Sequence, residues 1–161
     1  MVKDVTFAAL LEAVVEDLQG LFAGYTLVNS AGQEQTLHIY QQDLPVRDYE
    51  EDAQEPPPEP YIIVRLRSGG VAEEQEPQKL EILLLICVFD EDKNRQGYRD
   101  AMRILFEIYR HYAFCNLLGR RWLVRYPINW TMQDEDTHPY YFAALSFNVE
   151  APAIRKELPE C

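Results

Sequence analysis

The residues best suited to do chemistry in this sequence are acidic side chains gathered at two points. Asp90 and Asp92 end an apolar run and are followed by Lys93. Carboxylates that converge on Mg²⁺ or Mn²⁺, with a lysine near the scissile phosphate, are the equipment of a metal-dependent nuclease or hydrolase. A second acidic group, at 134–138, includes a histidine. Neighbouring acids in one turn point in different directions, so we expect no metal site in either group.

The other side chains capable of base or nucleophilic catalysis have no motif around them. His38 falls on a strand pattern, His111 on a helical pattern and His138 in a loop. The sequence contains no GxSxG, Walker A or GxGxxG motif and no EF-hand loop, and the glycine pair at 69–70 indicates only a tight turn. We therefore expect a protein that is not an enzyme, with no catalytic residue, metal or cofactor.

The cysteine pattern indicates free thiols. Cys87, Cys115 and Cys161 are odd in number and form no CxxC pair, which favours a reducing compartment. Cys87 lies in an apolar run and Cys115 on a helical pattern, so we expect both to be core residues. There is no secretory signal, and the most apolar window, 80–89, is too short for a membrane-spanning helix of about 20 residues. These features predict a cytoplasmic protein without a membrane segment.

The charge balance is strongly acidic. Asp and Glu number 27 against 15 Lys and Arg, which gives a net charge of −12 and a pI near 4.6. Such a surface repels phosphate backbones, which argues against a conventional nucleic-acid binder. An acidic wall would still let DNA slide past without sticking. The charge would equally serve solubility alone.

Two segments have the apolar period of amphipathic helices. We expect one helix at 6–20, capped by the threonine at its start. We expect a second at about 95–116, beginning at Asp92 or Asn94 and closed by Gly119. The apolar stripe of this second helix is predicted to pack in the core and comprises Tyr98, Met102, Leu105, Phe106, Tyr109 and Tyr112.

Strands are predicted from alternating or β-branched apolar runs. They cover 25–28 and 35–40, which form a hairpin, then 61–67, 80–89, 121–126 and 140–149. The almost uniformly apolar run at 80–89 indicates a central strand covered on both faces. Hairpin connections dominate, and helices do not alternate with single strands. The sequence thus predicts a single α+β domain over 1–161, with a mostly antiparallel sheet of about four to six strands and two main helices packed against it.

A Pro/Glu-rich segment at 43–60 interrupts this pattern. Its prolines remove backbone donors and favour extended geometry, so we expect a long loop or arm that is not a buried element. The arm is either a solvated tether or an extended segment that orders against a neighbouring subunit. The tail from about residue 153 is expected to be frayed.

Charged residues of opposite sign suggest a contact between copies of the chain. An acidic loop follows the third predicted strand, and arginines lie on the second helix. The residues of this possible subunit or tube interface are Glu73, Glu74, Glu76, Arg99, Arg103 and Arg110. If the arginines of one copy met the acids of the next, the contact would be head-to-tail and could close into a ring. The alternative is a solvated helix face with intrahelical ion pairs.

Four stretches in a fixed order carry a family resemblance. They are TFAALLEAVVEDL near the start, the proline-introduced PYIIVRL with a Gly-Gly end, EILLLICVFDEDKNRQGYRDAMRILFEIYRHY, and PYYFAALSFNVEAP after a Trp-containing segment. In this layout, over most of 5–152, the chain resembles the tail-terminator (tail-completion, minor tail protein) family of long-tailed phages and prophages. The insert at 43–60 and the acidic tail depart from the family pattern.

The resemblance implies an α+β subunit that assembles into a ring, typically a hexamer. Such a ring caps the tail tube, stops its elongation and offers a face to the head-completion or connector protein, while DNA only passes through the channel. The protein would be found in the host cytoplasm during assembly and then in the virion tail or neck. The alternatives are a neck or head–tail joining protein, a metal-dependent nuclease using Asp90, Asp92 and Lys93, or a bacterial adaptor that binds a partner through 43–60.

Overall fold

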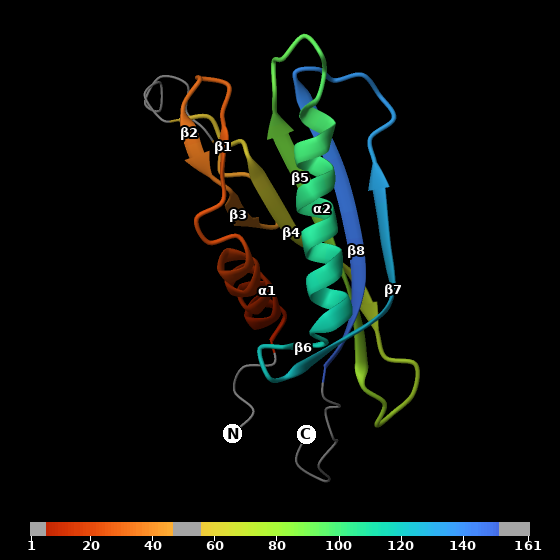
Figure 1. Ribbon diagram of the computed structural model, residues 1–161. Helices are drawn as coiled ribbons and strands as arrows, with labels where there is room; N and C mark the ends of the chain where they lie inside the picture. The colour runs from red at the N-terminus through yellow and green to blue at the C-terminus, as the bar shows by residue number, and fades with distance from the viewer. Residues whose placement is uncertain (1–5, 47–55, 152–161) are drawn as a thin grey trace.

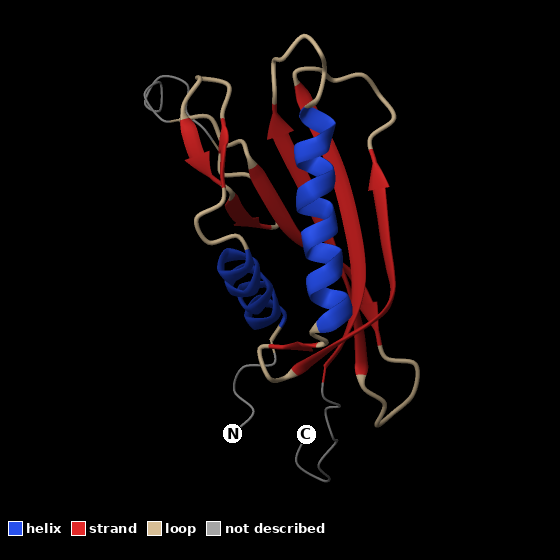
Figure 2. Cartoon of the chain, in the orientation of Figure 1, coloured by secondary structure: helices blue, strands red, loops and turns tan. Residues whose placement is uncertain are grey.

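The computed structural model describes residues 6–46 and 56–151. In chain order, their elements are α1 (Phe7–Leu21), β1 (Thr26–Val28), β2 (Glu34–Thr36), β3 (His38–Gln41), β4 (Tyr61–Gly70), β5 (Gln78–Phe89), α2 (Gly97–Phe114), β6 (Leu117–Leu118), β7 (Trp122–Met132) and β8 (Tyr140–Ala151). Figures 1 and 2 show α1 and α2 on one face of a six-stranded sheet, with β1 and β2 forming a small separate sheet. The expected α+β class is confirmed.

The first helix begins and packs as its sequence pattern predicts. Thr6 caps α1, because its Oγ1 accepts a hydrogen bond from the Ala9 N–H at 3.1 Å. The apolar stripe of the helix faces the sheet, and its fully buried members are Leu10, Val14 and Leu18. These side chains join the sheet and α2 in one hydrophobic core. The helix at 6–20 is therefore confirmed to within one residue at each end.

The larger sheet has the strand order β3-β4-β5-β8-β7-β6, and its neighbours are antiparallel except for β3 and β4. The hairpin expected at 25–28 and 35–40 is only half right. Leu37 is buried, and its N–H donates to the Tyr25 carbonyl at 3.2 Å. The chain turns away from β1 there, so that β3 leaves the hairpin and pairs in parallel with β4.

The central strand β5 is covered by helices on one face, not on both as its composition suggested. Ile82, Leu84 and Ile86 are completely buried under α1 and α2. Leu83 and Leu85 point to the other face and are half-buried. We call this second face, which none of the described helices covers, the open face. Its apolar residues explain why the run at 80–89 resembles a doubly covered strand.

The strand β7 extends past the position where the sequence indicated its end. Pro127 and Trp130 were expected between strands, yet β7 continues to Met132. Its pairing with β8 shifts register between Arg125 and Asn129, which accommodates the proline. A proline at an irregularity of an edge strand is compatible with a sheet, because it removes no ladder hydrogen bond.

The boundaries of α2 also differ from expectation. Gln96 occupies the N-cap position without a side-chain hydrogen bond. Asp92 instead accepts the Asn94 N–H at 2.9 Å within the preceding turn. Gly97 is required for packing, because a Cβ there would collide with the ring of Tyr141. Gly119 lies beyond the helix, in the turn between β6 and β7, where its φ of +58° suits glycine.

Both ends of the 43–60 segment contact the rest of the fold. The Glu59 side chain is only 4% exposed, and its Oε1 accepts the Ser30 N–H at 3.1 Å. At the other end, Asp43 forms an ion pair with Arg65 at 3.0 Å. The expectation of an unburied segment is therefore wrong at Glu59. Residues 47–55 and the tail from 152 onward lie outside the described residues, as does Cys161.

Neither α1 nor α2, within the part of the chain that the structure describes, combines the length and apolarity that crossing a bilayer requires.

Candidate subunit interface

The apolar residues of α2 form two stripes, and only one of them is buried. The core stripe consists of Ala101, Ile104, Leu105, Ile108 and Tyr112. Tyr98, Met102 and Phe106, which were expected in the core, are 38%, 49% and 57% exposed. The expectation of one core stripe is therefore wrong in part. The apolar arc of α2 is wider than the sheet surface on which it packs, a difference that the helical period alone could not reveal.

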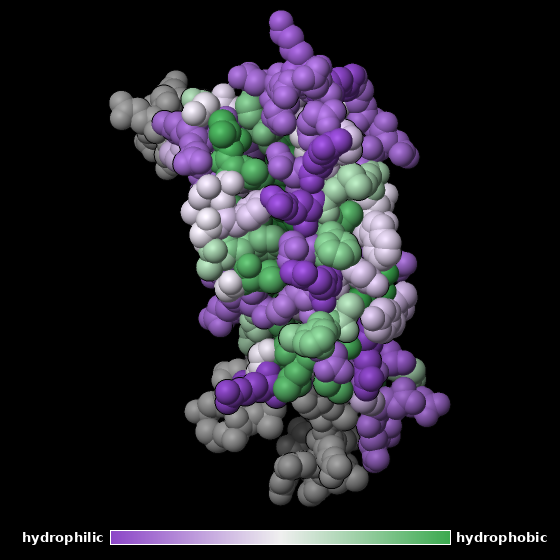
Figure 3. Space-filling view, viewed as in Figure 1, coloured by the Kyte–Doolittle hydropathy of each residue, from purple (hydrophilic) through white to green (hydrophobic). Residues whose placement is uncertain are grey.

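The exposed stripe continues onto the neighbouring edge of the sheet. The rings of Tyr109 and Trp130 lie 5.1 Å apart between centroids, and Phe106 lies 6.4 Å from Tyr109. Trp130 is 56% exposed. We call Met102, Phe106, Tyr109 and Trp130 the α2–β7 patch. In the space-filling view of the helix-bearing face, green apolar residues lie alongside the purple polar ridge of α2 (Figure 3).

The strand beneath this patch has a free edge. β6 pairs with β7 only at Trp122 and Leu123, so the outer side of β7 beyond them pairs with no other strand of the described residues. The stretch 126–132 contains no charged side chain. Soluble proteins commonly protect exposed edges with charges, proline or bulges, because an unpaired edge invites another strand. Pro127 and the register shift protect the start of this stretch, whereas residues 129–132 contain neither and lie beside the exposed aromatic rings.

The arginines proposed for the interface lie on the exposed side of α2 and already have local partners. Arg110 donates to Glu107 at 2.7 Å, one turn away. Arg103 hydrogen-bonds the hydroxyl of Tyr25, whose pKa is raised chiefly by burial. Arg99 lies in the first turn of α2. These contacts fit the solvated-face alternative and still leave all three guanidinium groups exposed.

The acidic members of the proposed interface do not meet these arginines within one chain. Glu73, Glu74 and Glu76 lie in the turn between β4 and β5. That turn stands at the end of the sheet opposite the start of α2, where Arg99 lies (Figure 1). A contact between Arg99 and these acids therefore requires a second copy, as the head-to-tail hypothesis assumes.

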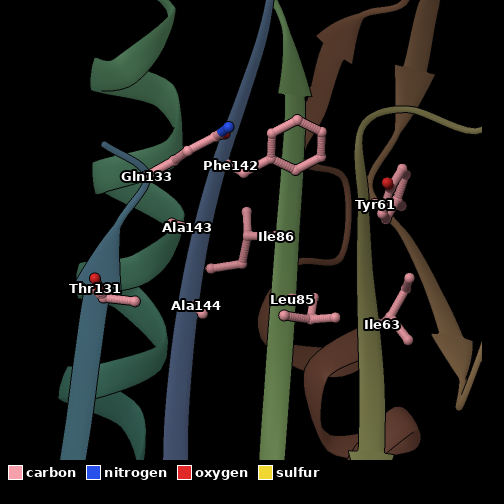
Figure 4. A pocket seen from close by; sticks show the side chains of 9 residues that line it. All are labelled: Tyr61, Ile63, Leu85, Ile86, Thr131, Gln133, Phe142, Ala143 and Ala144. Carbon is pink, nitrogen blue, oxygen red and sulfur yellow. The ribbon is translucent and has the colours of Figure 1, made fainter. Parts of the chain in front are cut away.

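The open face carries a shallow apolar groove. Its volume is about 240 Å³, and Figure 4 shows side chains from β4, β5, β8 and the end of β7 around it. The lining residues are Tyr61, Ile63, Leu85, Ile86, Thr131, Gln133, Phe142, Ala143 and Ala144. Beside it, burial raises the pKa of the Cys87 thiol to about 12, so this sulfur is not an activated nucleophile. The groove offers apolar contact and little chemistry.

Charges on the open face are largely paired. Arg67 lies 3.4 Å from Glu81, and Arg125 lies 3.3 Å from Glu150. These two pairs add no net charge to the open face. By contrast, residues 6–46 contain five Asp or Glu and no Lys or Arg.

The two acidic groups singled out in the sequence are joined by an arginine. Arg95 forms an ion pair with Asp136, and the pKa of Asp136 is lowered by the His138 N–H and by this guanidinium. Asp90 accepts the Asp92 N–H at 2.9 Å. No group of three or more metal-ligating side chains occurs in residues 6–46 and 56–151. These carboxylates stabilise turns.

The histidines have structural partners. His111 Nε2 lies 2.8 Å from Asp17, which links α2 to α1. His38 contacts the Tyr40 hydroxyl at 3.1 Å, and His138 contacts that of Tyr141 at 2.9 Å. Of the cysteines expected in the core, Cys87 is buried but Cys115 is exposed just after α2, because the helix ends before it.

No protein-family model matches the chain, and no curated protein matches it. Among the solved structures that match, one chain, whose name states no function, superposes with a TM-score of 0.48 at 12% sequence identity. The match covers 92% of this chain and 94% of the other. A similarity at this level carries no argument about function.

Proposed function

We propose that the chain is a structural, ring-forming subunit of a long-tailed phage or prophage particle, of the tail-terminator type. The observation that carries this proposal is the α2–β7 patch beside the free edge of β7 at residues 129–132. Monomeric proteins rarely present contiguous apolar surface of this kind unless it binds something. A subunit whose function is to assemble has a direct use for it.

A second feature supports an assembly role over a catalytic one. The carboxylates and histidines that could have served chemistry are engaged in turns, ion pairs and contacts between helices. Asp92 and Asp136 both accept backbone N–H groups, for example. The mechanism is then one of surface complementarity. One ring face would match the last ring of the tail tube, and the other would block further addition and receive the head connector.

Deletion of the gene in the phage or prophage that carries it tests this proposal. A terminator is expected to leave overlong tails of variable length in electron micrographs, because nothing stops tube growth. Tails of normal length without heads would instead identify a neck or head–tail joining protein. Normal, complete particles would contradict both assignments. Restoration of normal tails by the plasmid-borne gene controls for effects on neighbouring genes.

A further inference from the structure

We propose that neighbouring copies join edge to edge, with β7 of one copy pairing antiparallel with β3 of the next, so that Trp130 lies opposite Gln41 and Met132 opposite Ile39. This inference rests on the proposed ring-forming function and names its interface. Within the described residues, β3 lies at one edge of the larger sheet, and at the other edge β6 pairs with only two residues of β7, so both β3 and β7 have free outer edges. A second copy supplies the strand that each edge lacks.

The outward-facing groups of β7 follow from its pairing with β8. The Gln133 N–H donates to the Phe142 carbonyl. In an antiparallel ladder, hydrogen-bonded and non-hydrogen-bonded pairs alternate. Trp130 and Met132 are therefore in non-hydrogen-bonded pairs, with Leu145 and Ala143. Their N–H and C=O groups point away from β8, toward the free edge.

The outward-facing groups of β3 follow in the same way. The His38 N–H donates to the Pro60 carbonyl, and the Gln42 N–H donates to the Val64 carbonyl. Alternate residues of a parallel strand direct their amide groups to the same neighbour. The N–H groups of Ile39 and Gln41 therefore point outward, and the Gln41 carbonyl, which accepts the Asp43 N–H at 2.7 Å, has a second lone pair for a partner strand. Each edge thus offers outward residues two positions apart, which is the spacing of successive hydrogen-bonded pairs in an antiparallel ladder.

The strand directions agree with a ring. Along the sheet β3 and β4 run together, and each of the next neighbours β5, β8 and β7 reverses direction. β7 is thus antiparallel to β3 within one copy. Rotation about an axis along the strands preserves their directions, so β7 of one copy would meet β3 of the next in antiparallel orientation. Such a heterologous contact repeats around a closed ring.

The faces of the two edges also agree. Trp130 and Met132 share the face of Leu145 and Ala143, which are buried under the helices. Ile39 and Gln41 pair with Ile62 and Val64, which are also buried there. In the proposed register, the helix-bearing face of one copy therefore continues into the helix-bearing face of the next. If either strand directed the backbone groups of its alternate residues outward, the pairing would place the helices of neighbouring copies on opposite faces of the joined sheet.

Surface chemistry on the helix-bearing face supports the same pairing. α1 lies over β3 and exposes Glu12 and Glu16. α2 lies nearer β7 and exposes Arg99, whereas Arg103 hydrogen-bonds Tyr25 of its own copy. The contact would place the acidic helix of one copy beside the arginine-bearing helix and the α2–β7 patch of the next. In this arrangement the acidic partner of α2 is α1 and not the loop that contains Glu73.

Cysteine cross-linking between copies tests the register. Tyr40 and Thr131 would form a non-hydrogen-bonded pair, with Cα atoms about 4.5 Å apart, which a disulfide spans. The variants Tyr40→Cys and Thr131→Cys, each in a Cys115→Ser, Cys161→Ser background, are mixed and oxidised mildly. We expect a disulfide-linked heterodimer, and a ladder of larger species from the double variant. Asn129→Cys, two residues out of register, is the matched control and should lose the cross-link to Tyr40→Cys.

The possible outcomes distinguish failure of the proposed β7–β3 pairing from failure of the proposed ring-forming function. Rings in electron micrographs without the expected cross-link would overturn the β7–β3 pairing and leave the ring intact. Cross-linking of Thr131→Cys with itself would overturn it in favour of a two-fold β7–β7 contact. A protein that forms neither rings nor cross-links would overturn both proposals.

A backbone variant gives a second measurement, which does not depend on Tyr40. The Gln41 N–H points outward and is not used in pairing with β4, so Gln41→Pro should remove only the inter-copy hydrogen bond. We expect loss of the ring with an unchanged circular dichroism spectrum and melting temperature. Gln41→Ala, which keeps the N–H, should retain the ring. A ring that persists in the folded proline variant would overturn the pairing.

Discussion

Tyr109 of α2 and Trp130 of β7 hold their rings 5.1 Å apart and so connect the exposed side of the helix to the free edge of the sheet. The contact makes one continuous surface from two elements that are separated in sequence. It also orders the Trp130 side chain in advance, which lowers the entropic cost of burying it against a partner. Aromatic side chains of this kind commonly dominate the free energy of association.

The first prediction concerns this surface. Phe106→Asp should abolish assembly without unfolding the subunit, because the Phe106 side chain is 57% exposed and contributes little to the core. We expect the free energy of unfolding in urea to change by about 0.5 kcal/mol or less. Sedimentation velocity should show monomer only. An assembled Phe106→Asp variant would show that the α2–β7 patch is not the contact surface.

The matched control for this variant lies in the core. Phe147 is fully buried and stacks on Tyr112, with ring centroids 4.5 Å apart. Phe147→Ala should lower the free energy of unfolding by about 3–5 kcal/mol. Comparison of the two variants separates loss of assembly from loss of folding.

A second prediction concerns the link between the helices. Asp17 and His111 are both part-buried and lie 2.8 Å apart. Asp17→Ala should lower the free energy of unfolding by about 1–3 kcal/mol, because it leaves the imidazole without this partner. Its exposed neighbour provides the control, since Glu16→Ala should change stability by about 0.5 kcal/mol or less. Equal effects of the two substitutions would contradict a stabilising role for the pair.

A third prediction concerns thiol reactivity. Burial raises the pKa of Cys87 to about 12, so almost none of it is thiolate at neutral pH, whereas Cys115 is exposed. In a Cys161→Ser background, Ellman's reagent should therefore titrate one thiol per native chain and a second only after denaturation. Cys115→Ser should remove the fast-reacting thiol. Rapid reaction of Cys87 in that variant would show that the strand β5 opens readily.

A fourth prediction concerns acid stability. The pKa of Asp136 is lowered by the His138 N–H and by Arg95. A depressed carboxyl pKa stabilises the fold at pH values above the unfolded pKa of about 3.9, and this contribution disappears as the pH falls through the folded value. The difference in unfolding free energy between the wild type and Asp136→Asn should therefore be constant near neutral pH and shrink below about pH 4. The same Asp136→Asn substitution in an Arg95→Ala background should show a smaller pH-dependent difference, because one of the groups that lower the Asp136 pKa is gone.

Much of the fold could be predicted because its periodic signals are strong. The capped stripe of α1 determines a helix and its buried face, and the apolar run of β5 determines a strand but not which face the helices cover. The split at Leu37 could not be predicted, since a hydrogen bond to Tyr25 and the burial of one leucine decide it. The continuation of β7 past Pro127 likewise depends on a register shift against β8 that leaves no mark in the sequence.

The candidate interface was predictable only in part. The charged residues of the interface could be proposed from the sequence, because the signs of their charges are visible without a structure. The apolar contribution of Met102, Phe106 and Trp130 was assigned to the core or to a loop, since a helical wheel cannot show how wide a sheet the helix covers. The signal was present in α2 as apolar positions outside the buried stripe. These positions can be interpreted as part of an interface only when the structure shows the free edge of β7 beside them.

Sedimentation velocity of the purified protein over a wide concentration range, with electron microscopy of any large species, tests the central claim most directly. The ring-forming account predicts a discrete species near six times the chain mass of 18.8 kDa, about 113 kDa, that appears as a ring with a central hole. A strict monomer at every concentration would contradict a subunit that assembles with itself through the edges of its sheet.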